Sequence, residues 1–528
     1  MKKVIFYILV CFCLKSFGQN GAMVFNDTII HEIRITTPLE DWFTTLETDF
    51  KNNIENPELY PEIYHPCDVT FDGAAINNCG FREKGNASNT LANFGRKNPL
   101  KIAFDEFDNN QTFDGLKKIN LNIFINDPSL MHDVACNKLM RDAGLHSSRT
   151  AYTKVWVNNE YIGLYLIIEN VDKTFLKSKY GSAFNDGNLY KTDRGASVPL
   201  NWQGGDKQKY KDQGMKLTTN ESTDDWTGFI DFVNFLNNYT GEDFKQQLES
   251  RFDVHNYLKA LAVEKCVRSW DSYWGGGNNY YLYEHPDGKW RWIPWDMNET
   301  FQDIKVLSGT TILNGYLIPT PQIDERPLLK KIFQFDEYKE EYLNYACDFI
   351  QTKFNLNNLG PYLLKRHNLI DETYRADPNK LNTYSSFQNS LTEENEDVVS
   401  LTKSSFVLRI RYPGVFPFIQ MQREWVVQQL NGWEKGCEIE STGLYNLNVF
   451  PNPAKDYINI MNEGSGFEFA QFKLYSSAGK LYQISNFEIM TGNYFRLELP
   501  NIPAGIYLLL KLESNGRTGR AKVVVIDF

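Results

Sequence analysis

The hydrophobic pattern of the 528-residue chain changes twice along its length, and this order restricts the fold more than any single motif does. From Asn26 to about Phe107, apolar and polar residues alternate between turn residues, which predicts mainly strands. Helical spacing then dominates in four stretches: after Asp127, Trp226 to Ser269, Arg326 to Asn355, and Phe416 to Leu430. Strands followed by helices predict an α+β domain with a cleft between two lobes.

Two hairpins are predicted within this domain. Asn158–Asn159 joins two strand-like runs in AYTKVWVNNEYIGLYLIIENVD, and Asp287–Gly288 does the same in NNYYLYEHPDGKWRWIPW. Both dipeptides favour the left-handed backbone that tight hairpin turns require. The helix after Asp127 is expected to end near Gly144, since glycine is common just past a helix C-terminus.

The pattern changes again after a short polar linker at residues 437–446. From Leu447 onward, short alternating strands are separated by turn residues, as in VFPNPAKDYINI and YFRLELPNIPAGIYLLLKL. Residues 447–528 are therefore predicted to form a small all-β sandwich.

Residues 1–18 read as a secretory signal peptide. Lys2 and Lys3 precede an apolar run, and Ser16 and Gly18 supply the small residues that a signal peptidase needs. The run is too short for a permanent membrane anchor, so we expect no transmembrane segment in the mature chain. The large domain would then occupy residues 19–436.

The mature chain is expected to be strongly acidic. Removing the signal removes three lysines, which takes the formal charge from −11 to −14. Such a chain has no overall attraction for nucleic acid, which we do not expect as a partner.

Six cysteines remain after removal of the signal, an even number that permits disulfides outside the cytoplasm. Cys67 and Cys79 flank a short segment and are the best candidate pair. Cys136, Cys266 and Cys347 lie in apolar helical patterns, where buried free thiols are expected. The seven histidines have no ligand spacing, which argues against a structural zinc site.

Two segments of the strand region carry cations. FREKGNAS places Arg82, Lys84 and Asn86 at a glycine turn, where backbone N–H groups and positive charge can hold phosphates. KNPLKIAF places Lys97 and Lys101 in a strand-like run, where a lysine often reaches a charged partner. Each pattern also fits an ordinary surface turn or a surface lysine.

Two later segments carry oxygen ligands. In RSWDSYWGGGNNYYLY, Asp271 precedes a glycine-rich turn that is followed by Asn278 and Asn279. In WRWIPWDMNETF, Asp296 ends an apolar run, where a carboxylate needs a cation or a metal to compensate it. A turn that caps the backbone and a structural ion pair are the simpler interpretations. Cations, a loop acid, an amide and a second acid in this order suit phosphoryl transfer with Mg²⁺.

With these motifs in place, the chain resembles the CotH kinase family, named for spore-coat protein H, over roughly Ile30 to Gln429. The stretches that carry the resemblance are FREKGNAS, PLKIAFDEF, TFDGLKKINLN, NDPSLMHDVACNKLMRDAGL, VWVNNEYIGLYLIIENVDKTFL, GNLYK, NNYYLYEHPDGKWRWIPWDMNETF and RPLLKKIF. The resemblance implies an atypical, two-lobed protein-kinase-like fold. It also implies transfer of phosphate from ATP to protein serine or threonine hydroxyls with Mg²⁺.

The resemblance also implies roles for particular residues. Asp271 would be the catalytic acid of the loop, and Asp296 and Asn279 would bind the metal, with Asn278 as the alternative amide. The remaining candidates would bind the nucleotide: Arg82, Lys84, Asn86 and Lys101 near the phosphates, and Glu169 beside the adenine through backbone groups. Asp133 would pair with one of the lysines. The family often has an acid where this chain has Asn298.

The tail resembles a type A sorting domain of the type IX secretion system. The matching motifs are VFPNPAKDYINI, LYSSAGKLY and PAGIYLLLKL. This resemblance implies the secretion machinery as a partner and a secreted or cell-surface location.

Two alternatives to an active kinase remain open. The fold could serve surface assembly without turnover, or the 14% aromatic content could indicate a glycan-associated binding protein. The glycan interpretation predicts tryptophan side chains on an exposed face.

Overall fold

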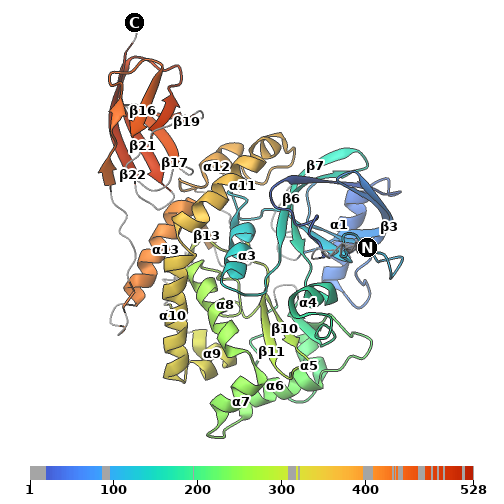
Figure 1. Ribbon diagram of the computed structural model, residues 1–528. Coiled ribbons are helices and arrows are strands. Elements are labelled where there is room, and N and C mark those ends of the chain that lie inside the picture. Colours follow the sequence, from blue (N-terminus) through green and yellow to red (C-terminus); the bar gives the residue numbers. More distant parts are fainter. Residues whose placement is uncertain are drawn as a thin grey trace, which may run out of the picture.

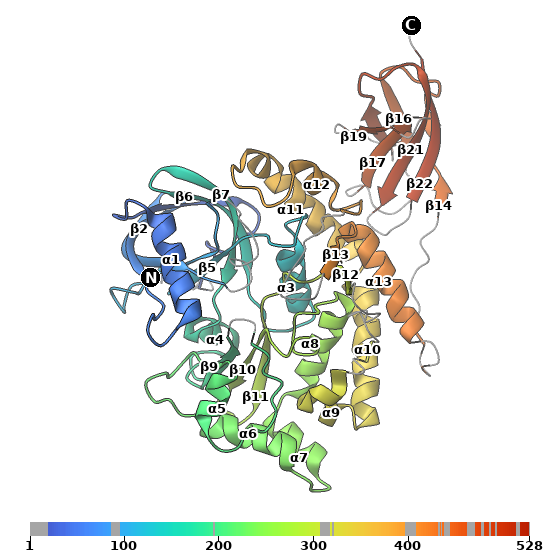
Figure 2. The same ribbon diagram turned by 180° about the vertical axis from the view of Figure 1, so that it is seen from behind.

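The structure is a computed structural model, drawn in Figures 1 and 2. It describes residues 20–526 apart from 86–95, 194–195, 307–316, 319–321, 396–407, 431–432, 434–435, 438–443, 462–469, 477–479, 485–486, 491–493 and 514–517. Mixed α+β structure fills the large domain, and sheets alone fill the tail.

The first part of the large domain is a closed barrel of seven strands in the order β1-β2-β3-β4-β5-β7-β6. A parallel pairing of β1 with β6 closes it, whereas the other neighbours in this order are antiparallel. The strands are β1 (Ile30–Thr36), β2 (His65–Phe71), β3 (Ala74–Glu83), β4 (Leu100–Ala103), β5 (Lys118–Asn122), β6 (Thr150–Val157) and β7 (Glu160–Glu169). The predicted hairpin at Asn158–Asn159 is confirmed, since both residues have positive φ between β6 and β7.

A helix interrupts the predicted run of strands. α1 (Trp42–Glu55) begins after Asp41, whose side chain accepts a hydrogen bond from the Thr44 amide. Trp42, Leu46 and Phe50 recur at four-residue intervals and are buried, so the helix has an apolar stripe. The expectation of mainly strands was therefore wrong over this stretch.

Helices surround a four-stranded sheet in the rest of the large domain, and α3 (His132–Asp142) lies between the barrel and this region (Figures 1 and 2). The sheet has the order β11-β10-β8-β9. Its strands are β8 (Leu189–Thr192), β9 (Met215–Leu217), β10 (Tyr280–Glu284) and β11 (Trp290–Pro294). The predicted hairpin at Asp287–Gly288 joins β10 to β11, with Gly288 at φ +88°.

The predicted helical stretches are confirmed, and further helices accompany them. The remaining elements of the large domain are α4 (Lys173–Tyr180), α5 (Lys207–Asp212), α6 (Thr227–Asn238), α7 (Phe244–Arg251), α8 (Val254–Cys266), a 3₁₀ turn at Gln322–Glu325, α9 (Pro327–Ile332), α10 (Asp336–Thr352), α11 (Leu356–Ala376), α12 (Tyr384–Asn389), α13 (Val415–Gln429) and the pair β12 (Asp303–Val306) and β13 (Leu408–Arg411). Among the described residues, no helix combines the length and apolar character needed to cross a membrane.

Aromatic side chains pack mainly inside this helical region. Trp292 stacks on Tyr280 with ring centroids 4.4 Å apart, and Tyr257 and Tyr273 meet the same indole edge-on. All eleven tryptophans lie in the described part of the chain, and each is buried or half-buried. The exposed tryptophan face expected of a glycan-binding protein is therefore absent from the described residues.

Helix α11 is tied to the barrel by buried charges. Lys97 Nζ lies 2.6 Å from Asp377 Oδ2, and both side chains are at most 1% exposed. The same carboxylate accepts the Leu164 amide of β7 at 2.8 Å. Of the two interpretations of Lys97, a charged partner or a surface lysine, the structure shows the charged partner. Because an unpaired buried charge is costly, this contact fixes the end of α11 against the barrel wall.

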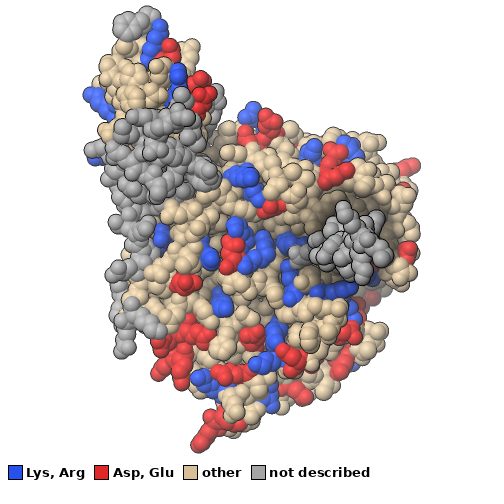
Figure 3. Space-filling view, in the orientation of Figure 1, with Lys and Arg blue, Asp and Glu red and all other residues tan. Residues whose placement is uncertain are grey.

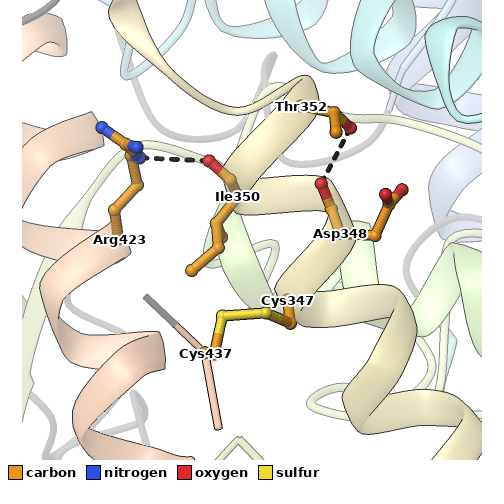
Figure 4. Close-up of a disulfide and its surroundings, with 6 residues drawn as sticks. All are labelled: Cys347, Asp348, Ile350, Thr352, Arg423 and Cys437. Carbon is orange, nitrogen blue, oxygen red and sulfur yellow. Dashed lines mark hydrogen bonds between the residues drawn. A yellow bond between two sulfur atoms is a disulfide. The ribbon is translucent and has the colours of Figure 1, made fainter. Parts of the chain in front are cut away.

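The disulfide links other cysteines than predicted. Cys347 of α10 is bonded to Cys437, 90 residues further on, while Cys67 and Cys79 are free and buried (Figure 4). The prediction for these two was wrong: they lie opposite each other on β2 and β3 and pack into the barrel core. The prediction that Cys347 is a free thiol was also wrong, because a helical pattern does not show which distant segment crosses it.

The tail forms two facing sheets at one end of the molecule (Figures 1 and 2). One has the order β14-β22-β21-β17-β18, and the other β15-β16-β20-β19. The strands are β14 (Leu444–Asn446), β15 (Val449–Phe450), β16 (Tyr457–Met461), β17 (Ala470–Ser476), β18 (Leu481–Gln483), β19 (Phe487–Met490), β20 (Tyr494–Glu498), β21 (Gly505–Glu513) and β22 (Thr518–Val525). The all-β prediction for the tail is confirmed, and one apolar core fills it.

Candidate functional site

The barrel wall made by β3, β4 and β5 carries polar side chains on its outer face. Successive strand residues point to opposite faces, and Phe81, Leu100, Ile119 and Leu121 belong to the barrel core. The residues between them therefore face outward: Arg82, Lys84, Lys101, Lys118, Asn120 and Asn122. This outer face looks toward α3 and the four-stranded sheet.

Lys84 lies beside two acids at one end of this face. Its Nζ donates to Asn122 Oδ1 at 2.5 Å. Burial lowers the pKa of Lys84 to about 8, although the negative charges of Asp296 and Asp133 oppose the shift. Burial raises the pKa of Asp133 to about 8, reinforced by the charge of Asp296 and partly offset by Lys84. A lysine from the barrel thus shares its surroundings with an acid of α3 and an acid from the loop after β11.

Asp271 is held by the two asparagines that follow it. Asn278 Nδ2 donates to Asp271 Oδ1 at 2.8 Å, and Asn279 Nδ2 donates to Oδ2 at 2.9 Å and to the Asp271 carbonyl at 2.6 Å. Burial raises the pKa of Asp271, and the nearby charge of Asp296 raises it further. The two carboxylates therefore belong to one site, with Asp271 fixed in orientation by amide groups.

The glycine turn between Asp271 and these asparagines is tightly packed. A Cβ on Gly275 would lie 1.9 Å from the Trp270 carbonyl oxygen, and Gly277 has φ +76°. Arg326 is buried here and donates to the carbonyls of Tyr273 at 2.7 Å and Gly275 at 2.6 Å. These glycines let the loop approach its neighbours closely, and α9 holds the loop through Arg326.

Asp271, Asn278, Asn279 and Asp296 offer oxygen atoms of the kind that Mg²⁺ prefers. Asn278 and Asn279 turn their amide nitrogens toward Asp271, which leaves their oxygens for another partner, and the buried Asn278 Oδ1 has no hydrogen-bond partner in the described structure. Asp296 is exposed, yet surrounding protein raises its pKa while Lys84 and Lys191 oppose the shift. No three carboxylate, imidazole or thiolate groups of the described residues could hold a metal alone. Amide oxygens, water and phosphate would complete the shell.

Four cations surround one carboxylate on the neighbouring part of the barrel face, and we call them the cation cluster: Arg82, Lys101, Lys191 and Lys216. Arg82 and Lys101 are opposite each other on β3 and β4, and Lys191 and Lys216 are opposite each other on β8 and β9. Glu62 lies among them, with Oε2 2.7 Å from Arg82 Nη2. Burial would raise the pKa of Glu62, but these four charges lower it below its usual value.

The cations of this cluster repel one another in the folded protein. Burial lowers the pKa of Lys101 well below its usual value, and Arg82, Lys191 and Lys118 add to the shift. Like charges directly opposite each other on adjacent strands are destabilising. Two such pairs concentrate positive charge on this part of a chain whose formal charge is −11.

The cation cluster lines a cleft of about 1090 Å³ between the barrel and the four-stranded sheet. Tyr64, Tyr281 and residues 170–174 also line it. Figure 3 shows lysine and arginine side chains gathered over the middle of the face that carries α3 and α4. The cleft is large enough for a nucleotide-sized ligand.

The remaining predicted residues lie apart from this arrangement. Asn86 is outside the described residues. Glu169 is ion-paired with Arg149, its amide donates to the Arg149 carbonyl at 2.9 Å, and its carbonyl accepts the Ser148 hydroxyl at 2.9 Å. Its backbone groups are therefore engaged by the fold, and residues 170–174, directly after it, line the cleft instead.

Sequence reasoning missed Glu62, Lys191, Lys216 and Glu299. Lys191 lies in GNLYK, so its motif was recognised but not its charge partners. Burial raises the pKa of Glu299 to about 8, with the charges of Asp271 and Asp296 adding to the shift. Because Glu299 follows Asp296 by only three residues, the sequence could have marked it as a further acid of this site.

Comparison with known proteins defines the class of the chain. The family model described as CotH kinase protein matches residues 81–401, more than half of the sequence, so the chain belongs to this family. Residues 448–526 match the model described as secretion system C-terminal sorting domain, which supports type IX secretion and a secreted or cell-surface location.

Curated relatives agree with the family. Inner spore coat protein H of Bacillus subtilis is 25% identical over 284 residues, which are 52% of this chain and 74% of that protein. Spore coat protein homolog 1 and Invasin CotH7, both of Rhizopus delemar, are 20% identical over 254 and 256 residues. These matches span 46% of this chain and only 40% and 41% of the two fungal proteins.

Proposed function

We propose that the protein is a secreted atypical kinase that transfers the γ-phosphate of ATP to serine or threonine hydroxyls of a protein, with Mg²⁺. Family membership supports a kinase-like or spore-coat-related protein, and the site geometry supports the finer assignment. The observation that carries it is the Asp271 carboxylate, which is fixed by two amide groups near the charge of Asp296. Asp296 in turn interacts with Lys84 and with Lys191, which lines the cation-lined cleft.

The two parts of the large domain would act as the lobes of a kinase-like fold. The barrel contributes Arg82, Lys84 and Lys101, while the helical region contributes Asp271 and Asp296. The cation cluster would hold the inner phosphates, and Lys84 with Asp296 would lie at the γ-phosphate. Lys191 belongs to both groups, since its charge affects the pKa of both Lys101 and Asp296.

In the transfer step, the acceptor hydroxyl oxygen bonds to the γ-phosphorus while the bond from that phosphorus to the bridging oxygen breaks. The hydroxyl proton passes to the Asp271 carboxylate, and ADP leaves with the bridging electrons. Asn278 and Asn279 keep Asp271 in place for this role. Mg²⁺ bound by Asp296 and an asparagine amide oxygen would neutralise charge that builds up on the phosphates.

The route to the cell surface is part of the proposal. The sorting domain supports passage through the type IX machinery. Residues 1–18 would first direct the chain across the inner membrane as a signal peptide, followed by the kinase domain at 19–436 and the linker at 437–446.

Radiolabel transfer tests the activity directly. Wild-type protein with Mg²⁺ and γ-labelled ATP should label a serine- and threonine-containing peptide pool, and Asp271→Asn should reduce the rate about 10²- to 10⁴-fold while ATP still binds. Full activity in Asp271→Asn would refute the assignment of the proton acceptor. ATP binding by the wild type without any transfer would instead support a non-catalytic assembly protein.

That second candidate has one observation in its favour. Asn298 stands where the family often has an acid, and its side-chain amide donates to Glu299 at 3.0 Å. A metal site with one carboxylate fewer would bind Mg²⁺ more weakly.

A further inference from the structure

The loop that carries Asp296 adopts an unusual backbone. Asp296 has φ +59° and Phe301 has φ +54°, and both lie between β11 and β12 without regular structure. Residues other than glycine pay energy for this conformation and keep it only where their surroundings enforce it. Something must therefore hold residues 296–302 in place.

The start of α3 and the turn before it contact this loop repeatedly. Asp133 Oδ1 accepts the Met297 amide at 3.2 Å, and His132 Nδ1 donates to the Asn298 carbonyl at 3.0 Å. Asn126 Nδ2 donates to Glu299 Oε1 at 2.9 Å. These three contacts reach three consecutive loop residues directly after Asp296.

Two further contacts extend the grip to the end of the loop. The Asn126 carbonyl accepts Gln302 Nε2 at 3.2 Å, and the His132 ring stacks on Phe301 with centroids 5.6 Å apart. Phe301 also packs against Phe418 of α13, at 5.4 Å. The loop is thus packed between α3 and α13 of the helical region.

The turn before α3 and the first residues of α3, residues 126–133, are held by hydrogen bonds of their own. Asp127 accepts the Ser129 and His132 amides at 3.0 and 2.8 Å, and the Ser129 hydroxyl at 2.6 Å. His132 and Asp133 are 3% and 7% exposed. A fixed turn at the start of α3 can therefore transmit its position to the loop.

We propose that Asn126, His132 and Asp133, here called the α3 clamp, are positioning residues that hold Asp296 in its metal-binding geometry. The inference rests on the proposed function, because it assigns Asp296 to Mg²⁺. The inference adds that a displacement of α3 would move the Asp296 carboxylate out of the metal site, although Asp296 itself is unchanged. Residues that orient metal ligands are commonly as necessary as the ligands.

Paired substitutions in the full chain test the clamp. His132→Ala removes the bond to the Asn298 carbonyl, whereas His132→Asn retains a donor at the same distance along the side chain. Asn126→Gly removes the bond to Glu299 and still tolerates the φ of +55° at this position. Lys138→Ala, on the partly exposed side of α3, is the matched control.

The main measurement is the Mg²⁺ concentration that gives half-maximal thermal stabilisation at fixed ATP. His132→Ala and Asn126→Gly should raise it about tenfold or more, while His132→Asn and Lys138→Ala stay close to wild type. If the clamp residues have a purely structural role, His132→Ala and Asn126→Gly will lower the melting temperature but leave the Mg²⁺ midpoint unchanged. That result would overturn the proposal.

Amide hydrogen exchange tests the clamp independently of the proposed kinase activity. In protein without nucleotide or metal, His132→Ala should expose the amides of residues 297–301 to faster exchange, and His132→Asn should not. If wild-type protein shows no Mg²⁺-ATP stabilisation, the proposed function fails, and unchanged exchange in His132→Ala still refutes the clamp independently.

Discussion

Lys191 and Lys216 lie directly opposite each other on β8 and β9, and no ion pair joins Lys216 to any acid that the structure describes. The pair faces Arg82 and Lys101 across Glu62, and Lys191 is also ion-paired with Asp193, at 3.6 Å. Binding of an anionic ligand would relieve the repulsion among these cations.

Removing one of these charges should therefore stabilise the free protein and weaken ligand binding together. Lys216→Ala is expected to raise the unfolding free energy by about 0.2–1 kcal/mol without ligand, by relief of cross-strand repulsion. The stabilisation by ATP should shrink, and both effects should fade in high salt. Thermal melts with and without ATP at two salt concentrations measure this, with Lys209→Ala on the exposed side of α5 as the control.

Asp296→Ala should abolish the Mg²⁺-dependent part of nucleotide binding. A ligand at about 100 times its Kd stabilises a protein by about 2.7 kcal/mol, and the share that needs Mg²⁺ should disappear. ATP added with a chelator should still shift the melting temperature, because the cation cluster is intact. Differential scanning calorimetry in Mg²⁺ and in chelator distinguishes the two contributions. Retention of the full Mg²⁺ effect would remove Asp296 from the metal site.

Reduction of the Cys347–Cys437 bond should destabilise the large domain. The bond closes a loop with a sequence separation of 90 residues that contains α11, α12 and α13. Loop-closure entropy then predicts a loss of about 4.6 kcal/mol in unfolding free energy. Urea unfolding of Cys347→Ser against wild type, each with and without reductant, measures it. Reductant should affect only the wild type, and equal curves for both proteins would contradict the bond.

Glu264 should make the protein less stable as the pH rises. Burial raises its pKa from an ordinary value of 4.5 to about 8, and the side chain is 2% exposed. Between pH 5 and 7 the folded state keeps this proton and the unfolded state loses it, so stability falls by up to about 1.4 kcal/mol per pH unit. Glu264→Gln should remove this slope. Urea midpoints at pH 5, 6 and 7 for both proteins give the difference, and parallel pH profiles would contradict it.

Local signals predicted the local structure well. The turns at Asn158–Asn159 and Asp287–Gly288 are encoded by residues that favour positive φ, and the sequence places their strands beside them. The tail was predicted for the same reason, since its strands follow one another with short turns. Helix α1 escaped notice because its polar residues dilute the apolar stripe.

Contacts between distant segments could not be predicted in this way. The cation cluster draws on the loop before β2, on the barrel wall, and on β8 and β9, and no single stretch contains its pattern. The partner of Cys347 lies 90 residues away for the same reason. The site acids Asp271 and Asp296 were found because Asp271 precedes a glycine-rich turn and Asp296 ends an apolar run, whereas Glu62 lies in an ordinary exposed loop.

Closure of the barrel by a parallel pair sets an order of assembly. β1 leaves the ribosome first, but its partner β6 follows only about 120 residues later, since Ile30 faces Tyr152. Until then one rim of the nascent sheet has unsatisfied backbone groups and can join a neighbouring chain. The first strand of this protein therefore completes its pairing only after β6 has been synthesised, and a holding chaperone would act during that delay.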